Sequence, residues 1–401
     1  MTADSPYFTA EHEEFRESVR TFFRKEVVPY AAGWEDQRRV PRSAWRALGA
    51  EGLLGLNHPR TVGGSDLDVF HSVVFLEELG GLGFGGLRFA VALHAYMATS
   101  YLATNGSAAL QERYLRPAVA GEAVAALAIT EPQAGSDLAG LTATAREDGD
   151  SFVIDGEKRF VVNGCYADFF VTAVRTGGTS AAGSGGTSTD ARGARGAQGD
   201  LSLVVVDRDA PGLEVIPNDS VAWRASGMAD LVLRGVRVPA ANVVGRRNSG
   251  FLQIMKNMQL ERLAAGISAV GDAASCLDLT WRFLKRRGAF GATLSAKQAV
   301  RHRLADLLTE AEATRALAHH AAWAWSRDAL AITECSMVKL KATELARTVA
   351  EECQHLHGAD GFRAGSPLVR IVQDARAATV AAGTSEVMRD IIAQSGYEEF
   401  R

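Results

Sequence analysis

The spacing of hydrophobic residues changes twice along the chain, and these changes divide it into three segments. In the first, apolar residues recur every three or four positions, as in Phe15, Val19 and Phe22. This spacing places an apolar face on a helix. The glycine-containing stretch 62–65 is typical of a turn between two such helices. We therefore expect a helical N-terminal domain over residues 1–123.

The second segment has the pattern of a β-sheet. Short runs of β-branched and aromatic residues, among them 152–154 and 159–162, are separated by Asp-Gly and Asn-Gly pairs such as Asp155-Gly156. Such pairs favour tight hairpin turns. The pattern predicts an antiparallel β domain over residues 124–243.

Within that domain, the stretch from Thr176 to Gly199 consists almost wholly of Gly, Ser, Thr, Ala and Arg. This composition buries too little apolar surface to order a chain, so we expect a flexible surface loop.

The third segment returns to helical spacing after Gly250 and keeps it to the end, which predicts a helical domain over residues 244–401. The sequence Ser-Ala-Lys-Gln at 295–298 has the form of a capping box, and Gly288 and Gly358 stand where helices should end.

Composition and charge exclude several classes of protein. The 401 residues carry a net charge of −4, so no basic field favours nucleic acid or anionic lipid. The four cysteines (Cys165, Cys276, Cys335 and Cys353) lie far apart, without the spacing of a zinc site or a disulfide framework. We expect no bound metal.

The apolar window 87–103 is interrupted by Arg88 and His94, which indicates a buried helix rather than a membrane span. The acidic N-terminal stretch has no apolar core of a secretory signal. The expected location is the cytoplasm.

Two short stretches of the chain could contact a cofactor. Residues 81–86 fit the pattern G-x-G-x-x-G, but they follow a helical pattern rather than a strand, so a connector between helices is the better interpretation. Residues 129–137 combine Pro132 and Gly135 with the hydroxyls of Thr130 and Ser136, which can bind the polar edge of a flat ring. Taken alone, this stretch could also be an ordinary polar loop.

The second stretch resembles the T-E-P-x-A-G-S-D signature of the acyl-CoA dehydrogenase family, and Lys158 to Gly164 resembles that family's K-x-[WF]-I-[TS]-N-G strand. Further motifs occur in family order: Val236 to Pro239, Arg287 with Phe290 and Gly291, Gln298, Leu356 to Gly358, and Gly383 to Glu386. The resemblance covers the whole chain. It implies an α+β fold with an N-terminal helical domain, a middle antiparallel β domain and a C-terminal four-helix bundle.

The resemblance also implies FAD as cofactor and assigns residues to it. Around the flavin ring these are Ile129, Thr130, Ser136, Phe160, Val161 and Val162; from a neighbouring subunit, Arg287, Phe290 and Gln298; and at the ADP portion, His355, Gly358, Thr384 and Glu386. For two of these residues a purely structural role stays open. Gln298 could only complete its capping box, and Arg287 could be a solvated residue at the end of a helix.

The catalytic base is expected at Glu261. Many family members have a carboxylate directly before the G-T-S triplet, but here that position is Ala382. The sequence Leu-Glu-Arg-Leu at 260–263 resembles the isovaleryl- and long-chain-type subset, whose base lies on this helix. Ile254, Met258 and Glu261 share one helical face, where an unpaired carboxylate is costly unless it is functional. The alternative is a surface glutamate paired with a neighbour such as Arg262.

The implied substrate is an acyl thioester of CoA or acyl carrier protein. Its contacts would include Ser136, Arg262, Ala382, Gly383 and Tyr96, although Tyr96 could equally be a core residue. In the family, the backbone N–H at the position of Ala382 binds the thioester oxygen. Electrons would pass to an electron-transfer flavoprotein, and the chain would form a homo-oligomer, a dimer or a dimer of dimers.

Two other functions remain. Val162 stands where the family usually has a hydroxyl residue near flavin N5, which suggests an oxidase or monooxygenase on the same fold. Ala382 suggests a non-catalytic thioester-binding protein. The presence of Glu261 speaks against both.

Overall fold

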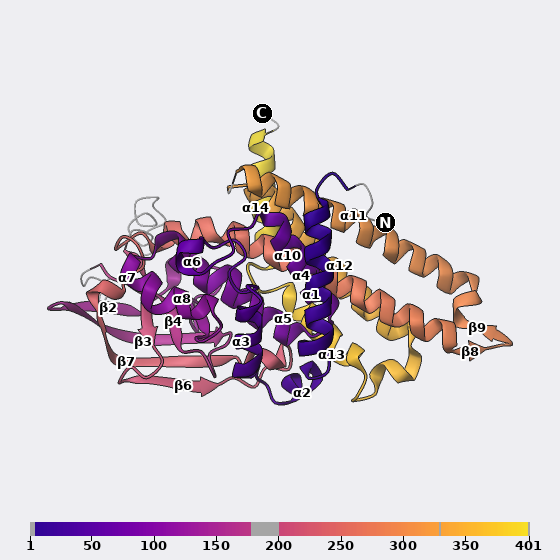
Figure 1. Ribbon diagram of the computed structural model, residues 1–401, viewed down its shortest axis with the longest axis horizontal. Coiled ribbons are helices and arrows are strands. Elements are labelled where there is room, and N and C mark those ends of the chain that lie inside the picture. The colour runs from indigo at the N-terminus through magenta and orange to yellow at the C-terminus, as the bar shows by residue number, and fades with distance from the viewer. Residues whose placement is uncertain (1–4, 178–199, 329, 400–401) are drawn as a thin grey trace.

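The computed structural model describes residues 5–177, 200–328 and 330–399, in which a sheet domain occupies one end of an elongated molecule (Figure 1). The N-terminal region is helical. Its elements are α1 (Ala10–Phe22), η1 (Phe23–Val27), α2 (Ala31–Asp36), α3 (Arg42–Ala50), η2 (Arg60–Val62), α4 (Val69–Gly81), α5 (Gly85–Ala92), η3 (Leu93–Ala98), α6 (Thr99–Asn105), α7 (Ala108–Leu110), η4 (Gln111–Leu115) and α8 (Arg116–Val119). The glycine-rich stretch 81–86 joins α4 to α5, as expected for a helix connector.

The middle region forms a seven-stranded sheet in the order β1-β4-β2-β3-β7-β6, with β5 paired to β4. Its elements are β1 (Ala125–Ala128), η5 (Leu138–Gly140), β2 (Thr144–Asp148), β3 (Ser151–Val161), β4 (Phe169–Arg175), β5 (Leu201–Asp207), β6 (Leu213–Pro217), η6 (Arg224–Ser226), β7 (Ala229–Pro239) and η7 (Ala240–Asn242). Most pairings are antiparallel, but β1 runs parallel to β4, which corrects the purely antiparallel expectation.

The predicted turn at Asp155-Gly156 is wrong. Both residues lie inside β3, where the register with β7 shifts between Ile154 and Gly156. The carboxylate of Asp155 accepts a hydrogen bond from the N–H of Gly235 (2.7 Å), which fixes a bulge rather than a hairpin. A Cβ on Gly156 would stand 2.6 Å from that of Ala143, so the segment that packs against β3 at this point requires glycine here.

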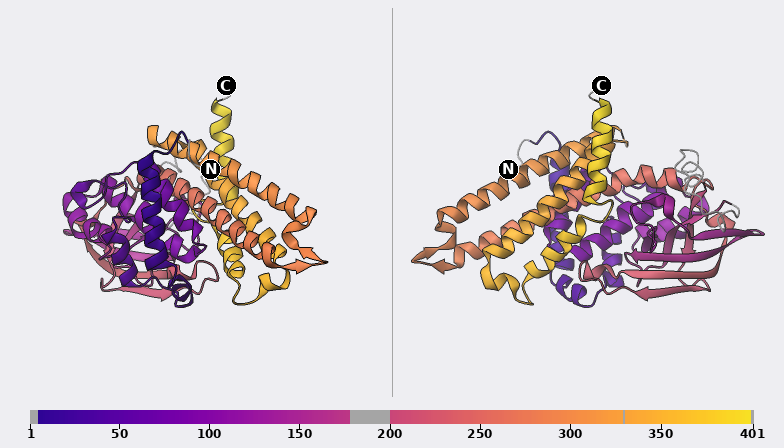
Figure 2. Two further views of the ribbon diagram at one scale, coloured as in Figure 1. Left: turned by 45° about the vertical axis from the view of Figure 1, so that its right-hand side comes forward. Right: turned by 180° about the vertical axis from the view of Figure 1, so that it is seen from behind.

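The C-terminal region is dominated by long helices that extend away from the sheet. Its elements are α10 (Gly250–Arg286), β8 (Gly288–Ala289), β9 (Ala292–Thr293), η8 (Leu294–Ala296), α11 (Gln298–Arg327), α12 (Ile332–Leu356), η9 (Gly358–Phe362), α13 (Pro367–Ala378) and α14 (Ser385–Glu399). The β8–β9 hairpin forms the tip of the molecule opposite the sheet (Figures 1 and 2). Gly358 follows α12 with φ 56°, as predicted for a helix end.

One local prediction is wrong, and a second is wrong at its first residue. The capping box at 295–298 does not form: residues 294–296 make a 3₁₀ turn, and α11 begins at Gln298 without a side-chain cap. Thr176, the first residue of the predicted flexible loop, is buried and shares hydrogen bonds with Ser202 and Asn248. From residue 178 to Gly199, that predicted loop lies outside the described residues.

The largest core joins the N- and C-terminal helices, and within this core α10 packs against α4. A Cβ on Gly80 would stand 2.2 Å from the carbonyl oxygen of Ser268, and one on Gly271 would stand 2.4 Å from that of Glu77. The two glycines therefore permit the close crossing that holds α10 in place. Among the described helices, none is long and apolar enough to span a bilayer.

Candidate active site

Glu261 lies on α10 with its side chain buried, 5% exposed, inside the molecule. Its Oε1 accepts two hydrogen bonds, from the Tyr101 hydroxyl (2.9 Å) and from the Asn257 side-chain amide (2.9 Å). The hydroxyl of Ser100 in turn donates to Oδ1 of Asn257 (2.6 Å), which orients that amide. Among the described residues no hydrogen bond reaches the other carboxylate oxygen, Oε2, so it is available to a substrate proton.

Burial raises the pKa of Glu261, while the bonds from Asn257 and Tyr101 and the charge of Arg262 oppose that rise. A carboxylate with a raised pKa binds a proton more strongly than an exposed one, which suits a base.

Arg262 does not neutralise Glu261. Its guanidinium points toward α12, with Nη1 3.5 Å from the Ser336 hydroxyl and 3.4 Å from Oε1 of Gln259. In the part of the chain that the structure describes, Glu261 makes no ion pair, so the alternative of a surface Glu–Arg pair is wrong. Arg262 instead links α10 to α12.

The tyrosine that donates to Glu261 is Tyr101. Tyr96 is buried in the core shared by the N- and C-terminal helices, so its expected contact with an acyl chain stays a prediction. Tyr96 lies within the π-helical segment η3, whereas Tyr101 lies on α6 directly after it, and a π-helical turn shifts the residues that follow it around the helix axis. A uniform helical period misses that change, and nothing else in the sequence marks Tyr101.

The loop after β1 is tied to β3 by a buried ion pair. Lys158 Nζ lies 2.7 Å from Oε1 of Glu131 and donates to the carbonyl of Ile129 (3.1 Å). Burial, partly offset by Glu131, lowers the pKa of Lys158 to about 8. The carbonyl of Thr130 accepts from the N–H of Arg159 (2.8 Å). The loop that was expected to meet a flavin ring is therefore held against the strand that was expected to flank it.

The end of β3 directs its side chains to different places. Phe160 has φ 56° and leaves its ring 59% exposed beside the loop. Val162 packs in an apolar cluster with Ile129, Met258 of α10 and other residues. Val161 belongs to the interior of the β domain, so any contact between this residue and a flavin on the Val162 side would come through its backbone.

The turn before α14 faces the same cluster, which Ala381 joins. Ala382 and Gly383 both have left-handed backbones, with φ 54° and 100°. The structure shows no acceptor among the described residues for the N–H groups of Ala382, Gly383 and Thr384. Three unpaired backbone donors in one turn form a binding place for an oxygen that carries negative charge.

Most of the remaining predicted cofactor residues are exposed, and several lie far from this cluster. Arg287, Phe290 and Gln298 surround the β8–β9 hairpin at the far tip, and the ring of Phe290 is 98% exposed (Figure 1). His355 and Gly358 are exposed at the end of α12, which a ring contact of 4.2 Å between Phe283 and His357 ties to the end of α10. Glu386 is exposed and Thr384 half-buried at the start of α14, while Ser136 is exposed on the loop after β1.

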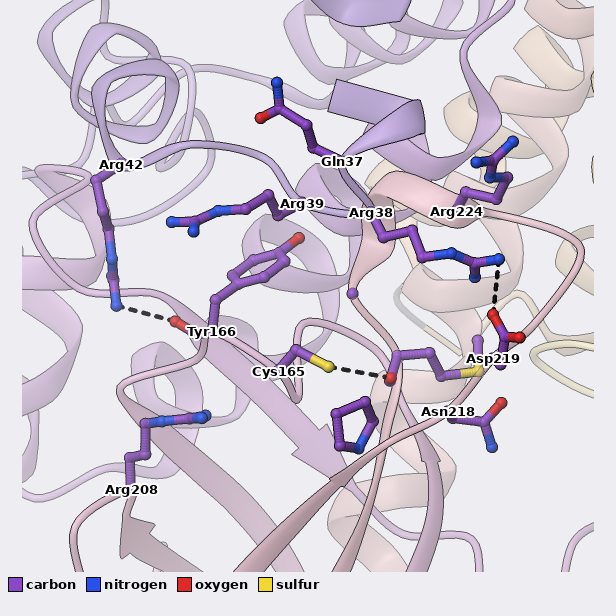
Figure 3. A pocket seen from close by; sticks show the side chains of 13 residues that line it. Gln37, Arg38, Arg39, Arg42, Cys165, Tyr166, Arg208, Asn218, Asp219 and Arg224 are labelled. Atoms are coloured by element: carbon purple, nitrogen blue, oxygen red, sulfur yellow. Dashed lines mark hydrogen bonds and ion pairs between the residues drawn. The ribbon is translucent and has the colours of Figure 1, made fainter. Parts of the chain in front are cut away.

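A crevice of about 570 Å³ lies elsewhere, between the N-terminal helices and the sheet (Figure 3). Five arginines line it: Arg38, Arg39, Arg42, Arg208 and Arg224. Several of them bridge the two regions, as Arg38 does to Asp219 (2.7 Å). Its polar walls do not suit an acyl chain, and Glu261 is not among its lining residues.

One group of residues has the composition of a metal site: His12, Asp68 and His71. However, Nδ1 of His12 already accepts the N–H of Thr9 (3.0 Å), so its Nε2 carries the hydrogen that it donates to Asp68 (3.0 Å). Asp68 also caps α4 through the N–H of Phe70 (2.8 Å). The group is accounted for as a helix cap.

Comparisons with known proteins cover the whole arrangement. Residues 9–122, 126–236 and 248–397 match the family models described as the N-terminal, middle and C-terminal domains of acyl-CoA dehydrogenase. The mitochondrial long-chain specific acyl-CoA dehydrogenase of Sus scrofa is 33% identical over 388 residues, which cover 96% of this chain and 86% of the pig protein.

Mitochondrial isovaleryl-CoA dehydrogenase of Pongo abelii is 28% identical over 393 residues, 97% of this chain and 89% of that protein. The crystal structure of an acyl-CoA dehydrogenase from Geobacillus kaustophilus superposes with a TM-score of 0.90 at 34% identity, covering 98% of this chain and 99% of that one.

Proposed function

The chain belongs to the acyl-CoA dehydrogenase family of FAD-dependent oxidoreductases, and we propose that it dehydrogenates an acyl thioester between the α- and β-carbons with Glu261 as the base. The observation that carries the proposal is the setting of Glu261. It is a buried carboxylate that makes no ion pair with any residue the structure describes, and Tyr101 and Asn257 position it through one oxygen.

The other oxygen of Glu261 takes the α-proton in this proposal. Burial raises the proton affinity of the carboxylate and excludes water, and both effects favour removal of a weakly acidic proton. The fixed bonds to Oε1 keep the base from rotating away, so little reorganisation is needed at the moment of transfer.

The negative charge that develops on the thioester oxygen is stabilised by the N–H of Ala382. This N–H has no partner in the described structure, and it belongs to a turn whose neighbour Ala381 packs in the same cluster as Met258, one helical turn from Glu261. Alanine supplies this donor as well as glutamate does, since only the backbone is used.

The described residues fit FAD at three places: the loop at Ile129 and Thr130, the exposed ring of Phe160, and the unpaired amides at Thr384 before α14. FAD, when bound, supplies the acceptor for the β-hydride. A free amide group at a helix N-terminus suits a pyrophosphate.

Arg287, Phe290 and Gln298 would serve the cofactor of a second copy of the chain. They are exposed at the tip opposite the sheet that carries Thr130 and Phe160 (Figure 2). We therefore propose at least a dimer, and an electron-transfer flavoprotein as the electron acceptor.

Flavin analysis and anaerobic reduction test the function. Protein that is extracted and chromatographed should yield FAD, and the flavin absorbance should bleach with at least one member of a panel of acyl-CoA and acyl-carrier-protein thioesters. FMN, or no bleaching across straight and branched acyl chains, would contradict the proposal.

Val162 favours a second candidate, an oxidase on the same fold. Its side chain is buried in the cluster beside Ile129 and offers no hydroxyl. Rapid reoxidation of the reduced flavin by oxygen, without an electron-transfer flavoprotein, would favour the oxidase.

A further inference from the structure

A second buried charge lies close to the turn at Ala382. Lys339 on α12 is 0% exposed, and its Nζ donates to two backbone carbonyls, those of Gly383 (2.6 Å) and Thr379 (3.2 Å). These carbonyls stand on either side of Ala382, so a single ammonium group closes the turn that presents the free N–H.

The charge of Lys339 has no ion-pair partner among the described residues. The charged groups that face it are Glu344 on the same helix, Arg262 from α10 and Glu386 from α14, none within ion-pair distance. Burial lowers the pKa of Lys339 to about 8, with Glu344 opposing that shift. Burying a charge in this way is costly, and the two carbonyls of the turn are the groups that the ammonium binds.

Two residues further along the same helix, Lys341 shows what an ordinary lysine does. Its side chain is 47% exposed and pairs with Glu310 on α11. A lysine that served only packing would extend its charge toward water in the same way, or be replaced by an apolar residue.

A second contact anchors the other end of the turn. The Ser385 hydroxyl donates to Oε1 of Glu344 (2.6 Å), and its N–H donates to the carbonyl of Thr379 (3.1 Å). The turn is thus attached to α12 on both sides of the left-handed residues Ala382 and Gly383, whose backbone conformation an unattached chain would rarely hold.

We propose that Lys339 is a positioning residue of the dehydrogenation: its ammonium holds the carbonyls of Thr379 and Gly383 and so aims the Ala382 N–H at the thioester oxygen. The proposal rests on the proposed function of the site. In this proposal, the stabilisation of the negative charge on the thioester oxygen depends on Lys339. The lysine does not touch that oxygen but acts through one hydrogen-bonded turn.

The test compares Lys339→Met with Lys341→Met in FAD-loaded enzyme. Two rates are followed with a thioester that bleaches the parent: single-turnover flavin reduction, and exchange of the substrate's α-proton into D₂O. In Lys339→Met both rates should fall together, by about 10- to 100-fold, the order of losing one oxyanion donor. In Lys339→Met, FAD content and the Kd of a non-reducible thioester should change by less than about threefold. Lys341→Met should match the parent in both rates.

A pH profile adds a signature that a purely structural lysine would not give. The α-proton exchange of the parent should decline as pH rises through about 8, where Lys339 loses its charge, and Lys339→Met should lack that decline. Glu344→Gln serves as a check that the decline belongs to Lys339. The charge of Glu344 raises the pKa of Lys339, so its removal should move the decline to lower pH.

The outcomes separate the two proposals. If the parent fails to bleach with every thioester, the proposed function fails. If the parent bleaches and both rates in Lys339→Met stay within about twofold of the parent rates, Lys339 is not a positioning residue. Should Lys339→Met not fold, Lys339→Gln carries the same test, because a shorter neutral donor cannot bridge both carbonyls.

Discussion

The two ends of α10 differ in how complete they are within one chain. Near its start, Glu261 is buried and receives hydrogen bonds from Tyr101 and Asn257. About 38 Å further along, just past the other end of the helix, the side chains of Arg287 and Phe290 are exposed, and Lys297 lies over the ring of Phe290 (5.8 Å). Glu261 thus has its polar partners within its own chain, which we call the finished end, whereas the exposed pair marks the open end.

The difference indicates a division of labour. In our proposal, proton removal uses fixed, buried groups, and the described part of one chain supplies Glu261 with Tyr101 and Asn257. The exposed tip instead offers a guanidinium and an aromatic ring to something outside the chain, which in our proposal is the cofactor of a second copy.

The largest effect is expected at the finished end. Glu261→Gln keeps the shape and the bonds at one oxygen but removes the base, so stopped-flow flavin reduction by substrate should slow by about 100- to 10,000-fold. FAD content and the thermal midpoint should be unchanged. The exposed Glu310→Gln is the control, and a rate for Glu261→Gln within a few-fold of the parent would refute the assignment.

A smaller effect is expected at the open end. Arg287→Ala should weaken FAD retention by about 10- to 150-fold, since a guanidinium–phosphate bond typically contributes on the order of 1.5–3 kcal/mol. Arg282, an exposed arginine near the end of α10 that pairs with Asp278, provides the control, and Arg282→Ala should retain FAD like the parent.

Equilibrium dialysis measures the retention of FAD, and light scattering measures the mass. A monomer of 42.7 kDa with full FAD occupancy would show that the tip serves no second copy.

The smallest effect is a shift in pH dependence. The Tyr101 hydroxyl stabilises the ionised form of Glu261, so Tyr101→Phe should raise the pKa of that carboxyl further. The acidic limb of the flavin-reduction profile should move to higher pH, with slower reduction below it and little change on the plateau.

Tyr96→Phe removes a hydroxyl from the same continuous helix without touching Glu261, and its profile should match the parent. Equal shifts in both variants would mean that the bond from Tyr101 does not set the proton affinity.

The division into helices, sheet and helices follows from hydrophobic spacing, because burial of one face imposes a period of 3.6 on a helix and of 2 on a strand. Turn signals were less dependable. Asp155-Gly156 reads as a hairpin turn from local preference, yet pairing with β7 keeps β3 continuous through it. The Ser-Ala-Lys-Gln sequence at 295–298 likewise forms a different local structure, since the β8–β9 hairpin sets where α11 begins.

The sequence by itself determined the family, the three-part order and Glu261 as the candidate base, because these depend on motifs and on a carboxylate on an apolar helical face. Tertiary structure alone decided what acts on that carboxylate. Tyr101 stands 160 positions from Glu261 and Lys339 stands 44 from Gly383, and no local pattern records either pairing. Which tyrosine or lysine is brought to the site depends on how α6, α10 and α12 pack, and that packing is set by contacts spread over the whole core.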